Sequence, residues 1–155
     1  MSIELKDVSR SNFDAVLKLD VDESQRGFVA PNVKSIAESK VYDIFHPRAI
    51  YKEDELIGFL MYGQDDGKTD DVWIIRFMID KAYQGKGYGK AAMISVINEM
   101  KDRYNMDKIF LSFEPENTMA QNLYEKLGFI NTGRIEHGEL VYCLDMKNFK
   151  TKLDK

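Results

Sequence analysis

The spacing of apolar residues along the chain predicts a succession of strands and helices. The run "DVWIIRFMID" at 71–80 is almost continuously apolar, which is typical of a central strand covered on both faces. After it, Met93, Val96, Ile97 and Met100 recur at helical spacing. Applied to the whole chain, such patterns predict the order strand, helix, helix, strand, strand, strand, helix, strand, helix, strand, strand.

Turn and capping residues set the expected boundaries. The expected strands lie at 2–8, 49–52, 56–63, 71–80, 108–113 and in a closing hairpin within 128–146 that turns near His137 and Gly138. The expected helices lie at 9–20, at 32–41, from the glycine-rich segment to Tyr104, and at 116–129. Asn32 is expected to cap the second helix, with an apolar stripe formed by Val33, Ile36, Ala37 and Val41. The order predicts an α/β (α+β) fold: a mixed sheet with a parallel crossover and helices on its faces.

Composition limits the function classes. The chain has 155 residues, is 44% hydrophobic and carries a net charge of −4, which fits one globular domain and argues against a nucleic-acid partner held by overall positive charge. A single cysteine, Cys143, excludes an intrachain disulfide, and His46 and His137 lack metal-ligand spacing, so no metal is expected. Without a signal-peptide pattern or a membrane-length apolar run, a cytoplasmic protein with no membrane partner is expected.

The segment "YQGKGYGKAA" at 83–92 places three glycines between the predicted central strand and the next helix. Glycine weakens both kinds of element, so three together require a reason. A glycine-rich turn at a helix N-terminus exposes backbone N–H groups and suits a phosphate. The Walker A pattern fails because Ala91 follows Gly89 and Lys90, and because Gln84 stands at the position of its first glycine. The dinucleotide pattern is weak because the spacing is G-x-G-x-G, late in the chain.

Two further patterns point to a family. Gln84, Gly87 and Gly89 match Q/R-x-x-G-x-G/A, and residues 117–129 match N-x-x-A-x-x-L-Y-x-x-x-G-F. With both signatures in this order, the chain resembles the GCN5-related N-acetyltransferase (GNAT) superfamily over essentially its whole length. The resemblance implies a single N-acetyltransferase domain over 1–155, with a mostly antiparallel sheet of about seven strands flanked by about four helices. It also implies acetyl-CoA as the co-substrate, no metal, and direct transfer of the acetyl group to an amine.

The resemblance assigns the cofactor-binding residues. The pyrophosphate would meet backbone N–H groups of the loop, and the residues expected there are Gln84, Gly85, Lys86, Gly87, Tyr88, Gly89 and Lys90. In such folds the preceding strand bulges and splays from its neighbour, so the pantetheine arm pairs with the backbone of Phe77 and Ile79. Met78 would supply an N–H near the thioester carbonyl. Asn117 either bonds the pantetheine or is a plain helix N-cap.

Amine acetylation sets two chemical demands. An alkylamine with a pKa near 10.4 is neutral in only about one molecule in a few thousand at pH 7, so a proton must be removed. The departing sulfur needs a donor, and the resemblance assigns Tyr124 to that part; the alternative is a core aromatic on its helix's apolar stripe. No residue identifies itself as the base, and the candidates, acting directly or through water, are Glu23, Asp71 and Glu139.

The stretch "LDVDESQRGFVAPNVKSIAES" is similar to small bacterial diamine and spermine/spermidine N-acetyltransferases. Asp22 and Glu23 supply negative charge there and Glu139 supplies more near the last hairpin, so these three are the expected substrate-binding residues for a linear polyamine. For Asp22 and Glu23, a solvated acidic loop is the alternative. The competing functions are a protein or peptide N-acetyltransferase and a non-catalytic acetyl-CoA sensor. A homodimer is also expected, because such folds often pair through edge strands or terminal hairpins.

Overall fold

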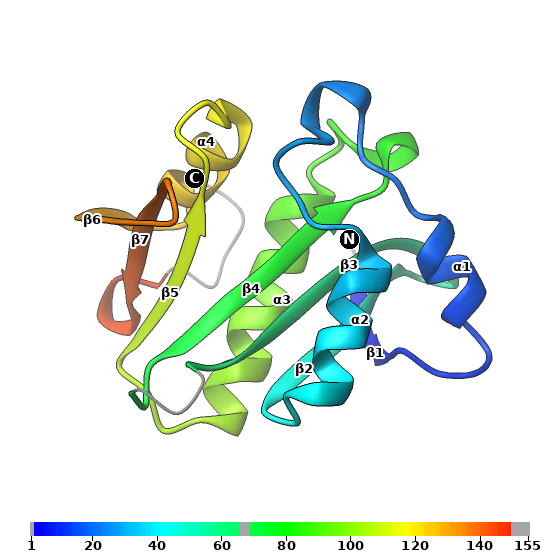
Figure 1. Ribbon diagram of the computed structural model, residues 1–155, viewed down its shortest axis with the longest axis horizontal. Helices are drawn as coiled ribbons and strands as arrows, with labels where there is room; N and C mark the ends of the chain where they lie inside the picture. Colours follow the sequence, from blue (N-terminus) through cyan, green and yellow to red (C-terminus); the bar gives the residue numbers. More distant parts are fainter. Residues whose placement is uncertain (1, 66–68, 150–155) are drawn as a thin grey trace.

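The computed structural model describes residues 2–65 and 69–149, and one seven-stranded sheet runs through this part of the chain (Figure 1). The strands are β1 (Ile3–Asp7), β2 (Phe45–Lys52), β3 (Glu55–Gln64), β4 (Val72–Ile79), β5 (Lys108–Phe113), β6 (Ile130–Glu136) and β7 (Glu139–Asp145). Their spatial order is β1-β2-β3-β4-β5-β7-β6. All neighbouring strands pair antiparallel except β4 and β5, which pair parallel. The predicted mixed, mostly antiparallel sheet is confirmed.

Four α-helices within the described residues cover the sheet. They are α1 (Phe13–Lys18), α2 (Asn32–Val41), α3 (Tyr88–Arg103) and α4 (Thr118–Lys126). Residues of α3 and α4 pack in one apolar cluster, and residues of α1 and α2 pack in another. Figure 1 shows α2 in front of the sheet and α3 behind it. The predicted order of strands and helices is therefore confirmed.

Several boundaries differ from those predicted. The first helix begins at Phe13 because Asn12 closes a turn before it, accepting the backbone N–H of Ser9 at 2.8 Å. The second strand begins at Phe45, four residues earlier than expected. Asn32 was wrongly expected to be a cap: Pro31 holds that position, and the buried Asn32 amide donates to the Val16 carbonyl at 3.0 Å. Asn32 therefore ties α2 to α1.

The apolar stripe predicted for the second helix is only partly buried. Val33 is 57% exposed and Val41 is 75% exposed, whereas Ile36 packs against the smaller core. Ala37, between them, is exposed as well, so of the four residues predicted for the stripe only Ile36 packs against the core. The helix packs through its middle, where Ser35 is fully buried and Ile36 is partly buried.

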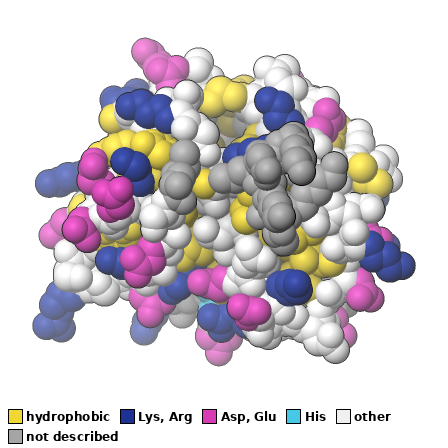
Figure 2. Space-filling view, turned by 180° about the vertical axis from the view of Figure 1, so that it is seen from behind, with side chains coloured by type: hydrophobic (Ala, Val, Ile, Leu, Met, Phe, Trp, Pro, Cys, Tyr) yellow, Lys and Arg dark blue, Asp and Glu magenta, His cyan; other side chains and the backbone are white. Residues whose placement is uncertain are grey.

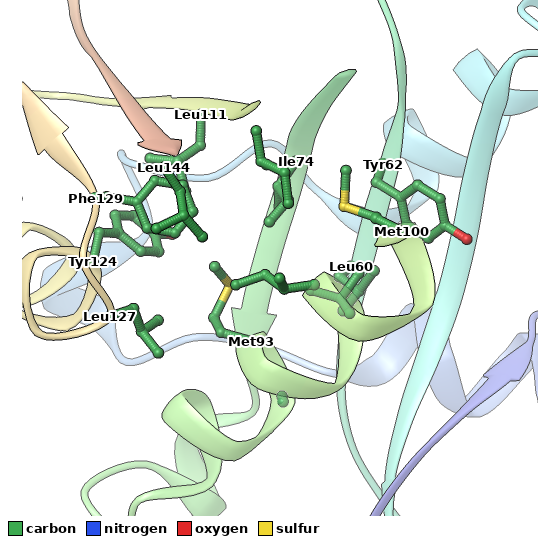
Figure 3. Close-up of a cluster of buried hydrophobic side chains, with 14 of the residues drawn as sticks. Leu60, Tyr62, Ile74, Met93, Met100, Leu111, Tyr124, Leu127, Phe129 and Leu144 are labelled. Carbon is green, nitrogen blue, oxygen red and sulfur yellow. The ribbon is translucent and has the colours of Figure 1, made fainter. Parts of the chain in front are cut away.

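The sheet separates two apolar cores. The larger lies between the sheet and the helices α3 and α4, and Figure 3 shows Leu60, Met93 and Leu111 within it. The smaller lies beneath α1 and includes Val16 and Met78. Strand β4 contributes Val72, Ile74 and Ile79 to the larger core and Met78 to the smaller. Its nearly continuous apolar sequence thus reflects burial on both faces, as predicted.

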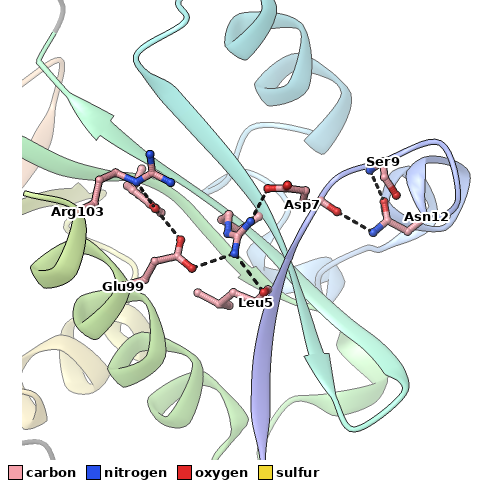
Figure 4. A network of polar contacts seen from close by, with 8 residues as sticks. Leu5, Asp7, Ser9, Asn12, Glu99 and Arg103 are labelled. Carbon is pink, nitrogen blue, oxygen red and sulfur yellow. Dashed lines mark hydrogen bonds and ion pairs between the residues drawn. The ribbon is translucent and has the colours of Figure 1, made fainter.

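A polar network fixes the C-terminal half of α3 to the far edge of the sheet (Figure 4). Arg48 on β2 pairs with Asp7 on β1 at 2.5 Å and with Glu99 on α3 at 2.9 Å. The same Glu99 accepts the hydroxyl of Tyr62 at 2.6 Å, and Arg103 donates to that hydroxyl at 3.0 Å. Because charge-assisted bonds are among the stronger polar contacts, this network holds α3 while its N-terminus faces the opposite end of the sheet.

The end of β4 depends on close backbone approach at Gly58, which pairs with Ile79. A Cβ at Gly58 would lie 2.5 Å from the carbonyl oxygen of Met78, so Gly58→Ala must displace β4. We expect a loss of about 1–3 kcal/mol in the free energy of unfolding, because overpacking costs that much. Chemical denaturation measures it. Gly27→Ala is the matched control, because a Cβ there meets nothing within 4 Å. Equal stability of the two variants would contradict this packing.

Candidate active site

The site begins where β4 and β5 separate. The two strands pair only at Val72 with Ile109 and at Trp73 with Phe110, and they diverge beyond that point, as Figure 1 shows. A bulge in β4 accompanies the separation: the register against β3 shifts so that Ile75 is the extra residue. The later backbone groups of β4 that face β5 therefore lack a strand partner. The expected bulge and splay are both present.

The glycine-rich loop leads from β4 into the N-terminus of α3. Gly85 and Gly87 have φ values of 76° and 84°, in the left-handed region that favours glycine, and Gly87 is the N-cap of the helix. A glycine N-cap supplies no side-chain acceptor, and the first turn of α3 contains no acidic residue. The first N–H groups of the helix therefore remain available to an anion. This geometry fits the pyrophosphate of acetyl-CoA.

A cavity of about 500 Å³ lies between this loop, the end of β4 and the helix α4. Nine of the expected cofactor-binding residues line it: Phe77, Met78, Ile79, Gln84, Gly85, Gly87, Gly89, Lys90 and Asn117. Two do not. Lys86 is exposed on the loop, and Tyr88 packs near Tyr83, with Lys52 over its ring at 5.6 Å. We refer to this space as the cofactor cavity.

A second cavity, of about 450 Å³, adjoins the first. The two share Val29, Phe77, Asn117, Ala120 and Tyr124 in their walls. The second cavity extends along β4 to Trp73, and its opposite wall includes Ser112 and Glu139. We refer to it as the acceptor cavity.

The structure separates the expected acidic residues. Glu139 lines the acceptor cavity, where the Ser112 hydroxyl donates to its Oε1 at 2.7 Å. Asp22, Glu23 and Asp71 line neither cavity. Asp22 is exposed and caps a short 3-10 helix (Glu23–Gln25), and hydrogen bonds from Ser24 hold the pKa of its carboxyl below the ordinary value. Of the three base candidates, only Glu139 thus faces a cavity.

Tyr124 stands where the two cavities meet. It is 8% exposed, and its ring centroid lies 5.6 Å from that of Phe113. Figure 3 shows it beside Phe129, whose ring centroid lies 5.9 Å away. Burial raises the pKa of its phenol above the ordinary value. The hydroxyl therefore keeps its proton at neutral pH and can only donate or accept a hydrogen bond. Tyr124 is a core aromatic and a cavity-wall residue at once, so the two alternatives raised by the sequence are compatible.

Asn117 likewise combines two positions. It is the N-cap of α4, and its side-chain oxygen accepts the backbone N–H of Ala120 at 3.2 Å. It also lines both cavities. The N-cap expectation is confirmed, and its bond fixes the first turn of the helix that carries Tyr124.

Sequence reasoning missed three residues of the site. Gln25 lines the cofactor cavity and Trp73 lines the acceptor cavity. The Ser112 hydroxyl donates a hydrogen bond to Glu139. A signal existed for Ser112, which is a polar residue inside the apolar strand "KIFLSF" and so faces the opposite side of the sheet from its buried neighbours. No such signal marked Gln25, whose partner Gln84 lies 59 residues away.

Residues 13–129 match the family model described as "Acetyltransferase (GNAT) family". The chain belongs to the GNAT acetyltransferase family. This confirms the resemblance inferred from the two sequence signatures. It also supports an N-acetyltransferase with acetyl-CoA as co-substrate, for which the splayed strands and the anion-binding loop provide a fitting site.

Relatives of this GNAT chain carry polyamine names. It is 35% identical over 152 residues to a "Probable spermine N(1)-acetyltransferase" of Bacillus subtilis subsp. natto and equally to a "Spermine/spermidine N(1)-acetyltransferase" of Bacillus subtilis strain 168. Each match covers 94% of this chain and all of the relative. A spermidine N-acetyltransferase from Vibrio cholerae, solved with CoA and spermine, has the same fold: TM-score 0.74 at 18% identity, covering 94% of this chain and 97% of the other.

The described residues contain neither a membrane-spanning helix nor a metal-binding cluster. No helix there is long and apolar enough to cross a membrane. No group of three or more His, Cys, Asp or Glu side chains in that part of the chain can hold a metal ion.

The position of Tyr124 predicts a specific loss of rate. We expect Tyr124→Phe to lower kcat by about 10²-fold while acetyl-CoA binding is retained, because a hydrogen-bond donor aimed at the charge that develops on the sulfur contributes about that much. Steady-state kinetics and calorimetry with CoA measure the two effects. Tyr104→Phe is the control: its hydroxyl is buried without a partner among the described residues, and it lines neither cavity. A loss below about threefold for Tyr124→Phe would exclude Tyr124 from the mechanism.

Proposed function

We propose that this chain transfers the acetyl group of acetyl-CoA directly to a primary amine of a small polycation, namely spermine, spermidine or a related diamine. The observation that carries the proposal is the meeting of the two cavities at Tyr124. One cavity has the loop geometry that suits a pyrophosphate, and the other contains carboxylates among aromatic rings. Such a pair of cavities brings a thioester and an amine together from opposite sides.

The charge of the acceptor cavity supports a cationic substrate. Its wall includes Asp65, Glu136 and Glu139, and its arginine, Arg76, is paired with Glu38 at 3.1 Å. Glu136 forms an ion pair with Arg134, two residues earlier on the same strand, β6. Within the described residues no cation pairs with Glu139, whose Oε1 is held by Ser112. Its second oxygen can therefore receive an ammonium group.

Aromatic side chains complete the same wall. Trp73, Phe28, Phe45 and Phe77 line the cavity, and Trp73 stacks on Phe110 with ring centroids 5.4 Å apart. Ring faces attract ammonium groups, and the apolar surface suits the methylene segments between the amines of a polyamine. Carboxylates and rings together favour a linear polyamine over a neutral or anionic acceptor.

The chemistry assigned to the residues follows. Glu139 binds the ammonium form of the amine and receives its proton, directly or through water, so that the nitrogen lone pair can attack the thioester carbon. The carbon–nitrogen bond forms, the nitrogen gives up its second proton to water, and the carbon–sulfur bond breaks to release CoA as its thiolate. The backbone N–H of Met78 stabilises the carbonyl oxygen, and Tyr124 donates a hydrogen bond to the sulfur as it gains charge. The raised pKa of Tyr124 keeps the proton on its phenol oxygen, so the residue acts as a hydrogen-bond donor to the sulfur and transfers no proton in full.

The remaining residues have supporting parts in the proposal. The loop from Gln84 to Lys90, Lys86 and Tyr88 included, surrounds the pyrophosphate, and Phe77 and Ile79 pair with the pantetheine through their backbones. Asn117 fixes the start of α4 beside it. Asp22 and Glu23, exposed on the loop between α1 and α2, attract a polycation at longer range.

Three wider assignments belong to the same proposal. Residues 1–155 form one N-acetyltransferase domain. The enzyme works in the cytoplasm, where a lone buried thiol such as Cys143 stays reduced. It pairs into a homodimer.

The surface charge bears on the expectation that no nucleic acid is a partner. On the face shown in Figure 2, basic and acidic side chains are interspersed, so that face has no continuous basic field.

A substrate panel tests the acceptor class. We expect thiol release from acetyl-CoA with spermine and spermidine at a kcat/KM at least about tenfold above that for a lysine peptide, because each lost charge contact costs roughly 1.5 kcal/mol or more. Turnover with the peptide alone would identify a protein N-acetyltransferase. Tight CoA binding without turnover on any amine would identify a sensor. Either result would contradict the proposal.

Isosteric variants separate two of the three candidate bases, Glu139 and Asp71. We expect Glu139→Gln to raise the KM for spermidine about tenfold or more and to lower kcat, because the amide neither attracts the ammonium nor accepts its proton. Asp71→Asn should leave both constants within about twofold of the wild type, since Asp71 lines neither cavity. Steady-state kinetics measure both variants. If Asp71→Asn impaired kcat and KM more than Glu139→Gln did, Glu139 would not be the base.

A further inference from the structure

The loop between α1 and α2 forms part of both cavities. Val21, Gln25 and Val29 line the cofactor cavity, and Phe28, Val29 and Ala30 line the acceptor cavity. One short segment therefore supplies walls to both spaces. Any displacement of this segment alters the two cavities together.

The loop is attached to the segment that follows β4 at two points. At the first, Asp80 accepts the backbone N–H of Asp20 at 2.9 Å, and Lys81 donates its N–H to the Asp20 carbonyl at 2.8 Å. At the second, the Gln84 amide donates to the side-chain oxygen of Gln25 at 3.0 Å. Asp20 lies before the wall residues, whereas Gln25 lies among them.

The Gln25 side chain bridges two sides of the cofactor cavity. Its oxygen accepts from Gln84 in the glycine-rich loop, and its Nε2 donates to the sulfur of Met119 on α4 at 3.0 Å. All three residues line that cavity. The bridge thus connects the loop that suits the pyrophosphate, the segment that forms the acceptor wall and the helix that carries Tyr124.

Gln84 is fully committed to this arrangement. Its Nε2 donates to the Ile79 carbonyl at 2.9 Å and to Gln25 at 3.0 Å, which uses both amide hydrogens. A main-chain carbonyl can only accept, so the Ile79 contact fixes which end of the Gln84 amide is the donor. The Gln84 side chain therefore has no hydrogen left for a phosphate, and its part is to hold the loop to β4 and to Gln25.

We propose that Gln25 is a positioning residue that transmits occupation of the cofactor cavity to the acceptor wall. This inference rests on the proposed function. A ligand held by the amides of the glycine-rich loop fixes Gln84, Gln84 fixes Gln25, and Gln25 fixes the neighbouring wall residues Phe28 and Val29. Acetyl-CoA and the amine then favour each other's binding, and because binding coupling is reciprocal, the effect is the same in both directions.

Hydrogen exchange with CoA in the absence of an amine tests whether occupation of the cofactor cavity orders the loop between α1 and α2. In the wild type, CoA should slow amide exchange at residues 85–90 and also at residues 21–30, about tenfold at the latter. Gln25→Ala should keep the protection at 85–90 and lose most of it at 21–30. Gln25→Glu should restore it, because a carboxylate oxygen still accepts the Gln84 N–H.

Steady-state kinetics test whether Gln25 in turn orders the acceptor wall for the amine. Gln25→Ala should raise the KM of the amine about tenfold, with kcat and the affinity for CoA within about threefold of the wild type, and Gln25→Glu should recover most of the loss. Lys34→Ala is a matched control for a side-chain truncation, on the first turn of α2 and outside both cavities. A structural role alone would lower stability and leave this KM-specific pattern absent.

The outcomes distinguish the two proposals. CoA that protects neither segment would overturn the proposed function. Protection at 85–90 without protection at 21–30 in the wild type would overturn the role of Gln25 alone. Equal protection at 21–30 in the wild type and in Gln25→Ala would also overturn the role of Gln25.

Discussion

The structure depends on the incomplete pairing of β4 with β5. Two parallel strands at the centre of a sheet would ordinarily pair along their whole length, because unpaired backbone groups are costly to bury. Here pairing stops after Trp73. The bulge at Ile75 turns β4 away from β5, and the opening lies beside the N-terminus of α3. A gap lined by backbone donors and acceptors, next to a helix N-terminus, suits an extended ligand that carries a phosphate group.

The opening is flanked by rigid parts of the molecule. The network around Arg48 and Glu99 secures the far end of α3, and the larger apolar core secures its middle. Buried Asn32 joins α2 to α1 on the opposite face. The loop between those two helices has few such contacts, and its polar ties run to the segment after β4 and to Met119 on α4. Rigid elements therefore place the reacting groups, while the acceptor wall is attached mainly through hydrogen bonds.

Local patterns in the sequence were sufficient for the order of elements and for the cofactor loop. The apolar run in β4, the turn residues of the hairpins and the three glycines each reflect a constraint within a few residues, so each can be interpreted from the local sequence. The position of Tyr124 followed from a motif of 13 residues. Contacts between distant segments could not be read in this way. The bridge from Gln25 to Gln84 and the bond from Ser112 to Glu139 depend on how the loop and the hairpin pack. Asp22 and Asp71 carry the same charge as Glu139, but only Glu139 lines a cavity, and the local sequence does not reveal that difference.

The central claim is that coenzyme A occupies the opening between β4 and β5 and meets the main-chain amides that follow it. An amide-resolved NMR titration with coenzyme A tests this most directly. We expect the largest shifts at the amides of Phe77 to Ile79 and of Gly85 to Lys90, all following one binding curve. Heat of association in calorimetry together with unmoved signals at these two segments would contradict it.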